Sequence, residues 1–137
     1  MKKLFWIPIS LLLLLLAACA SPEAGEVDEG GYMNISVDTL KSMLDGRPDS
    51  FLLVNTHIPF AGDIPNTDLT IPYNEIVDNL DQLPQDKDAE IVLYCRSDGM
   101  SHAASHDLVE AGYTNVKNVL GGFNAWEAAG YPLIMEP

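Results

Sequence analysis

The chain has 137 residues, enough for one domain of ordinary size. Seven basic residues stand against 20 acidic ones, which gives a formal net charge of −13 at pH 7. Because so acidic a surface repels nucleic-acid phosphates and anionic lipid headgroups, we expect neither a nucleic-acid partner nor a basic membrane-binding patch.

The N-terminal segment, residues 1–18, has the pattern of a signal peptide. Lys2 and Lys3 precede an apolar run over residues 4–18, which is shorter than the ~20 residues a membrane-spanning helix needs. Residues 16–19, Leu-Ala-Ala-Cys, resemble the lipobox of bacterial lipoproteins. That resemblance implies cleavage before Cys19, acylation of Cys19, and attachment to the cell envelope on the extracytoplasmic side of a membrane.

Residues 19–32 are acidic, contain glycine and proline and have no apolar period, so we expect them to form a flexible tether behind the lipid. Residues 33–137 then form a domain with a single core. The chain has two cysteines. Once Cys19 is acylated, Cys95 is the only free thiol, and no intramolecular disulfide can form.

The expected domain alternates between strand-like and helix-like segments. Strands are predicted at residues 32–35, 51–54, 90–94 and 116–120, and helices at residues 36–46, 72–80, 101–111 and 123–129, with residues 55–70 irregular. Such an alternation predicts an α/β fold, a mostly parallel sheet with helices on both faces.

The chemistry is expected at Cys95, which follows the clearest strand directly. Sites in open α/β sheets lie beyond the carboxyl ends of strands, and a helix is predicted to begin shortly afterwards, at Ser101. Inward main-chain N–H groups and the positive end of that helix favour a thiolate and would hold an anion or a persulfide. We therefore expect Cys95 to be the catalytic group, with a substrate-binding loop made of Arg96, Ser97, Asp98, Gly99, Met100 and Ser101.

Here the chain resembles the rhodanese family. Residues 95–101, Cys-Arg-Ser-Asp-Gly-Met-Ser, are similar to its active-site loop, and residues 121–126 carry its Gly-Gly-aromatic-x-Ala-Trp pattern. The resemblance runs from about Asn34 to Leu133. It implies a rhodanese-like sheet flanked by helices, no cofactor, and sulfane sulfur carried as a Cys95 persulfide. The donor would be of the thiosulfate or polysulfide type, and the acceptor a thiol or cyanide.

Four departures from the family pattern change the charge around this loop. Asp98 stands where the family usually has glycine, and Met100 where many members have a second arginine. Residues 55–57 are Asn-Thr-His in place of Asp-x-Arg, and residues 62–65 are Gly-Asp-Ile-Pro in place of Gly-His-Ile-Pro. We expect the charge of Asp98 to oppose an anionic donor and a thiolate.

Other functions remain to be weighed against a sulfurtransferase. A non-catalytic sulfide carrier or a protein-binding module would use the same pocket, and Cys95 would be inert if it were merely a buried core thiol. A cysteine phosphatase needs an arginine where this chain has Ser101, and a thioredoxin-like protein needs a C-x-x-C motif. His102 and His106 share a helix face, but no matching thiol or carboxylate cluster is evident, so we expect no metal site.

Overall fold

The structure, a computed structural model, describes residues 25–136. The expected signal peptide and the expected acylation site, Cys19, lie outside these residues. Within the described range, no helix combines the length and the apolar character that crossing a lipid bilayer requires.

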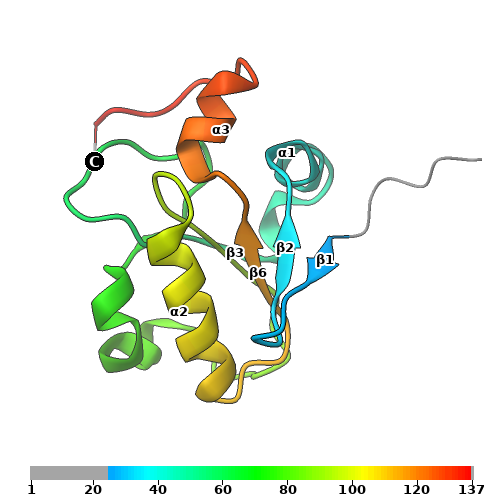
Figure 1. The fold of residues 1–137 in the computed structure, drawn as a ribbon, viewed down its shortest axis with the longest axis vertical. Helices are drawn as coiled ribbons and strands as arrows, with labels where there is room; N and C mark the ends of the chain where they lie inside the picture. The colour runs from blue at the N-terminus through cyan, green and yellow to red at the C-terminus, as the bar shows by residue number, and fades with distance from the viewer. Residues whose placement is uncertain (1–24, 137) are drawn as a thin grey trace, which may run out of the picture.

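A six-stranded sheet runs through the middle of the molecule (Figure 1). Its strands lie in the order β1-β2-β6-β5-β3-β4, and every neighbouring pair is parallel except β1 with β2. The strands are β1 (Glu26–Val27), β2 (Met33–Ile35), β3 (Leu52–Asn55), β4 (Leu69–Thr70), β5 (Ile91–Tyr94) and β6 (Val116–Val119). The predicted α/β fold with a mostly parallel sheet is therefore confirmed.

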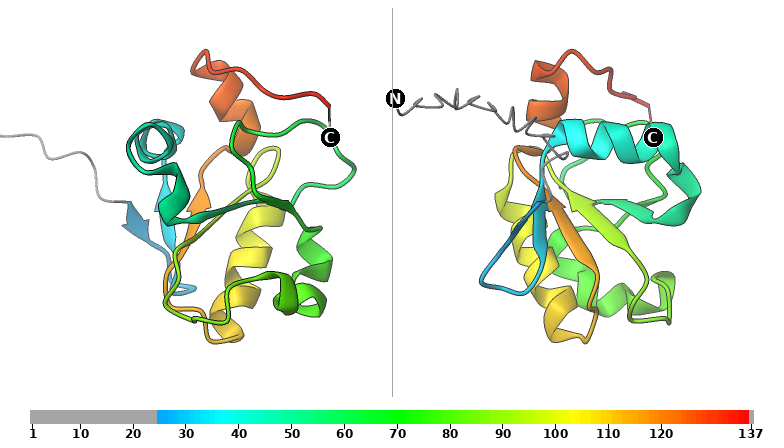
Figure 2. Two further views of the ribbon diagram at one scale, coloured as in Figure 1. Left: turned by 180° about the vertical axis from the view of Figure 1, so that it is seen from behind. Right: turned by 90° about the vertical axis from the view of Figure 1, so that its right-hand side faces the viewer.

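Helices cover both faces of this sheet (Figure 2). They are α1 (Val37–Gly46), α2 (Gly99–Glu110), α3 (Gly122–Ala128) and the 3-10 helices η1 (Pro48–Ser50) and η2 (Tyr73–Gln82). Helices α1 and α3 close one apolar cluster, and α2 and η2 close the other. Because β5 is buried on both faces, all four of its residues are apolar or aromatic and fully buried.

Local sequence signals set several helix ends. Ser36 caps α1, since its Oγ accepts a hydrogen bond from the N–H of Thr39 at 3.1 Å. Gly112 follows α2 with a φ of +97°, a left-handed conformation that favours glycine. The helix expected over residues 72–80 forms instead as the 3-10 helix η2, with non-helical backbone at Asn79.

Two segments differ from the sequence expectation. Glu26 lies opposite Asn34 in the β1–β2 pair, so the folded part begins before the expected boundary between residues 32 and 33. Strand β4 lies within residues 55–70, where no element was expected, and it pairs with the end of β3. A strand of two residues shows no alternation, so only its pairing reveals it.

Candidate functional site

Cys95 follows β5 directly, at the edge of the sheet where the parallel strands end. The neighbouring strand β3 ends beside it, with Asn55 opposite Tyr94. The next residue, Thr56, donates two hydrogen bonds to the Tyr94 carbonyl, from its N–H at 2.8 Å and from its Oγ1 at 2.9 Å. These bonds hold the segment that leaves β3 against the segment that leads into the Cys95 loop.

Helix α3 is seated with its N-terminus on the backbone of this loop. The N–H groups of Phe123 and Asn124 donate to the carbonyls of Cys95 and Arg96, at 2.9 and 3.0 Å. The first N–H groups of a helix have no partner within the helix, so the loop satisfies two of them. Gly122 permits this approach: its φ is +52°, and a Cβ atom there would lie 2.1 Å from the Cys95 carbonyl oxygen.

The N-terminus of helix α2 lies beside the thiol. The helix begins at Gly99, two residues before the expected start. In the described part of the chain, the main-chain N–H groups of residues 96–101 have no hydrogen-bond acceptor. The buried Ser101 Oγ lies 3.5 Å from Cys95 Sγ and 3.0 Å from the Asp98 carbonyl, and it can donate to either. The free N–H groups and the positive helix end both favour an anion at this position.

The carboxylate of Asp98 is held by the sheet and does not cap α2. Its Oδ1 accepts a hydrogen bond at 3.0 Å from the amide of Asn118, a fully buried residue of β6. The same amide donates to Oδ1 of Asn34 on β2 at 2.9 Å. Of the loop residues expected to bind substrate, Arg96, Ser97, Gly99 and Met100 line the pocket beside Cys95, whereas Asp98 and Ser101 do not.

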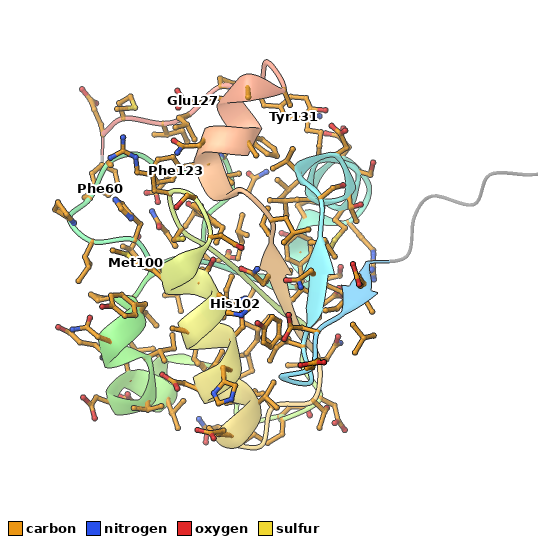
Figure 3. The ribbon with its side chains drawn as sticks, in the orientation of Figure 1. Phe60, Met100, His102, Phe123, Glu127 and Tyr131 are labelled. Atoms are coloured by element: carbon orange, nitrogen blue, oxygen red, sulfur yellow. The ribbon has the colours of Figure 1, made fainter. Side chains whose placement is uncertain are left out.

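A pocket of about 360 Å³ lies beside Cys95. Its lining residues are His57, Tyr73, Cys95, Arg96, Ser97, Gly99 and Met100. Figure 3 shows Met100 at the start of α2, with Phe123 of α3 above it in the view. Among these described residues Arg96 carries the only fixed charge, and none is a carboxylate. Cys95 lines this pocket but is only 2% exposed, so its thiol can be reached by small molecules that enter the pocket and not by large ones.

A second hollow, of about 650 Å³, runs along helix α1 from Ser36 to Arg47. It is larger than the pocket at Cys95, but none of the described residues that line it is a cysteine or a histidine. Of the two pockets, the smaller one is therefore the one that brings a thiol and an imidazole together.

His57 lines the pocket beside Cys95, although the sequence of residues 55–57 alone gave it no role. Its main-chain N–H donates to Asn55 Oδ1 at 3.0 Å. The side-chain amide of Asn55 in turn donates to the Gly62 carbonyl and to Asp63 Oδ1, at 3.1 and 2.8 Å. Burial and, next, the nearby Arg96 guanidinium lower the pKa of His57 below its ordinary value of 6.5. The imidazole is therefore neutral at neutral pH. The signal that could have identified it is a histidine just after an apolar strand, at the sheet edge that carries the nucleophile.

The two histidines of α2 do not form a site together. The ring of His102 packs edge-on against Tyr32 and hydrogen-bonds its hydroxyl, with 2.6 Å between Nδ1 and the oxygen. His106 instead lies near Asp107 and Glu110, with one possible ligand atom of each within 4.8 Å of the others. The sequence spacing did not reveal these carboxylates, but the group lies on the surface of α2, outside the lining of the pocket.

Comparisons with known proteins agree with this geometry. A profile of the rhodanese-like domain matches residues 32–129. A protein named sulfurtransferase from Allochromatium vinosum is 35% identical over 103 residues, which cover 73% of this chain and 92% of that protein. Thiosulfate sulfurtransferase 18 from Arabidopsis thaliana is 29% identical over 108 residues, which cover 79% of this chain and 76% of that protein.

Solved structures give the same result. A rhodanese-like domain protein from Staphylococcus aureus is 28% identical with a TM-score of 0.60, and the match covers 76% of this chain and 98% of that one. A rhodanese-related protein from Thermoplasma volcanium is 25% identical with a TM-score of 0.63, covering 75% of this chain and 98% of that one.

The pocket geometry predicts how charge controls the reactivity of Cys95. Arg96→Gln should lower the rate of alkylation by anionic iodoacetate, relative to neutral iodoacetamide, by about tenfold, the effect of losing one charge-assisted contact. Asp98→Asn should leave that ratio within about twofold, because the carboxylate is not in the pocket wall. Both rates are measured by intact mass in the full chain carrying Cys19→Ser, so that Cys95 is the only thiol. A large rise in the ratio for Asp98→Asn would place the carboxylate on the path of the anion.

Proposed function

The chain belongs to the rhodanese-like domain family, and from this we propose that it is a sulfurtransferase that carries sulfane sulfur as a persulfide on Cys95. The observation that supports this proposal most directly is the position of the thiol. Cys95 lies in a small pocket at the N-terminus of α2, beside main-chain N–H groups that have no acceptor among the described residues. Such a site stabilises a thiolate and a negatively charged persulfide.

In the first step, the Cys95 thiolate attacks the outer sulfur of a donor such as thiosulfate. A new S–S bond forms on Cys95 while the S–S bond of the donor breaks, and sulfite leaves with the electron pair. Ser101, whose hydroxyl lies 3.5 Å from Sγ, donates to the thiolate before the attack. Arg96 attracts and orients an anionic donor, and the N–H groups of the loop face the charge on the outer sulfur.

In the second step, a thiophilic acceptor attacks the outer sulfur and releases the Cys95 thiolate. The acceptor can be a thiol or cyanide, since both are nucleophiles small enough for the pocket. With Arg96 as the only fixed cation among the described lining residues and a chain charge of −13, the pocket suits a donor that carries less negative charge than the thiosulfate dianion.

Intact mass spectrometry tests the proposal. We expect the full chain carrying Cys19→Ser to gain about 32 Da, one sulfur atom, after incubation with thiosulfate or polysulfide, and to lose it again on addition of cyanide, because Cys95 is the covalent carrier. The matched control carries Cys19→Ser together with Cys95→Ser, has no thiol, and should gain no mass.

Two results would contradict the proposal. Failure of Cys95 to load from any donor would indicate a rhodanese-fold module that binds a partner without the reaction. Loading without discharge to any acceptor would indicate a sulfide carrier rather than an enzyme.

We also propose that the chain works outside the cytoplasm, anchored to a membrane through acylated Cys19. The lipobox-like residues 16–19 and the acidic surface, which gives no electrostatic attraction to anionic lipids, support this location. In a bacterial host, the full chain should fractionate with membranes and should require detergent for release. Cys19→Ser should abolish this behaviour, whereas Cys95→Ser should not change it. Membrane association that survives Cys19→Ser would rule out the lipid as the anchor.

A further inference from the structure

His57 is placed beside the nucleophile by the pairing of two strands. Asn55 lies opposite Tyr94, and the two hydrogen bonds from Thr56 to the Tyr94 carbonyl extend this register by one residue. His57 therefore leaves β3 alongside the point where Cys95 leaves β5. Both side chains line the same pocket.

The imidazole is held in place without engaging its ring nitrogens. Its main-chain N–H is fixed by Asn55, and its ring packs edge-to-face against Phe123, with 5.4 Å between the ring centroids. Phe123 also donates its N–H to the Cys95 carbonyl, so one residue positions both the base and the nucleophile. Among the described residues, neither ring nitrogen of His57 has a hydrogen-bond partner, and only 9% of the residue is exposed.

The surroundings keep this imidazole neutral. The titratable and charged groups that line the pocket with it are Cys95 and Arg96 from the loop after β5 and Tyr73 from η2. No described lining residue is a carboxylate that would stabilise an imidazolium. Burial and Arg96 both lower the pKa of His57, so at neutral pH a ring nitrogen is available as a proton acceptor.

We propose that His57 is the general base that removes the proton from a thiol acceptor during discharge of the Cys95 persulfide. This role rests on the proposed sulfurtransferase function and specifies its acceptor: a protonated thiol of small size. A thiol that enters the pocket reaches the outer sulfur of the persulfide from within the same cavity that His57 lines, which is the proximity that general-base catalysis requires.

The step balances without any further reactant. The S–H bond of the thiol breaks, and its proton passes to a ring nitrogen of His57. The electron pair left on the sulfur forms a bond to the outer sulfur of the persulfide, the S–S bond of the persulfide breaks, and its electrons return to Cys95 as the thiolate. The products are an alkyl persulfide anion and an imidazolium, which afterwards releases the proton to water.

The test compares acceptors that have a proton to lose with acceptors that have none. The full chain carrying Cys19→Ser is loaded with sulfur, and discharge of Cys95 is followed in a single turnover at pH 7 to 8. The acceptors are an alkyl thiol, mostly protonated at this pH, an aromatic thiol that is already a thiolate, and sulfite, which attacks through a lone pair. The variant is His57→Gln, and the matched control is His102→Gln, a histidine of α2 outside the pocket lining.

We expect His57→Gln to load at the normal rate and to discharge to the alkyl thiol about 100-fold more slowly, the usual contribution of a general base. Discharge to the aromatic thiolate and to sulfite should change by no more than about threefold, since no proton is transferred. The deficit with the alkyl thiol should shrink as the pH rises and the thiol ionises in solution. His102→Gln should behave like the parent chain with all three acceptors.

Each other outcome contradicts the inference in a recognisable way. If His57→Gln discharges to the alkyl thiol at the parent rate, His57 is not the base. If it slows all three acceptors equally, His57 only shapes the pocket. If the parent chain itself does not load, the proposed function fails and the role of His57 fails with it.

Discussion

The seating of helix α3 on the backbone of the Cys95 loop is the contact on which the geometry of the site depends. Two N–H groups of the helix donate to the carbonyls of Cys95 and Arg96 and so fix the backbone of the loop. The N–H groups of the loop itself take no part in these bonds and have no acceptor in the described structure. Gly122 makes the approach possible, since any Cβ atom there would overlap the Cys95 carbonyl. At the other end of α3, the indole of the buried Trp126 donates to the Pro132 carbonyl at 2.9 Å and anchors the helix in the core.

The charges around the pocket are arranged so that an acidic protein can still hold an anion. Asn118 binds the Asp98 carboxylate at the sheet, and the pocket is lined by Arg96 and by no carboxylate among the described residues. On the opposite side, Asp63 Oδ1 accepts hydrogen bonds from Asn55 and from the Tyr94 hydroxyl. A second carboxylate at position 55, as in the family pattern, would repel Asp63. The change from the family pattern to Asn55 and the change to Asp63 therefore go together, because the Asn55 amide can donate to the Asp63 carboxylate and a second carboxylate could not.

The sequence was sufficient for the features that depend on local pattern. The apolar strand before Cys95, the Ser36 cap and the glycine after α2 follow from periodicity, capping and φ, and the structure contains all three. Other features depend on contacts between distant segments and leave no local signal. The direction of the Asp98 carboxylate is set by Asn118, 20 residues away. The role of Gly122 is set by a carbonyl on another element, and strand β1 exists only through its pairing with β2.

His57 illustrates the same division. Its residue type and its place after a strand are visible in the sequence, but its burial, its contact with Phe123 and its position in the pocket require the register between β3 and β5. The pattern comparison marks residues 55–57 as a change from the family. Only the fold shows that the change puts a neutral base beside the thiol.

The most direct test of the central contact is the rate of sulfur loading of Cys95 in Gly122→Ala, with Gly130→Ala as the control. Both glycines have positive φ, +52° and +87°, but a Cβ atom at Gly130 meets nothing within 4 Å. Backbone strain should lower the free energy of unfolding by about 1 to 3 kcal/mol in each variant, and the overlap with the Cys95 carbonyl should lower it further in Gly122→Ala. We expect only Gly122→Ala to slow loading of the folded protein, by tenfold or more (about 1.4 kcal/mol per factor of ten), because only it displaces the Cys95 loop. Equal loading rates in the two variants would show that the seat of α3 does not position the thiol.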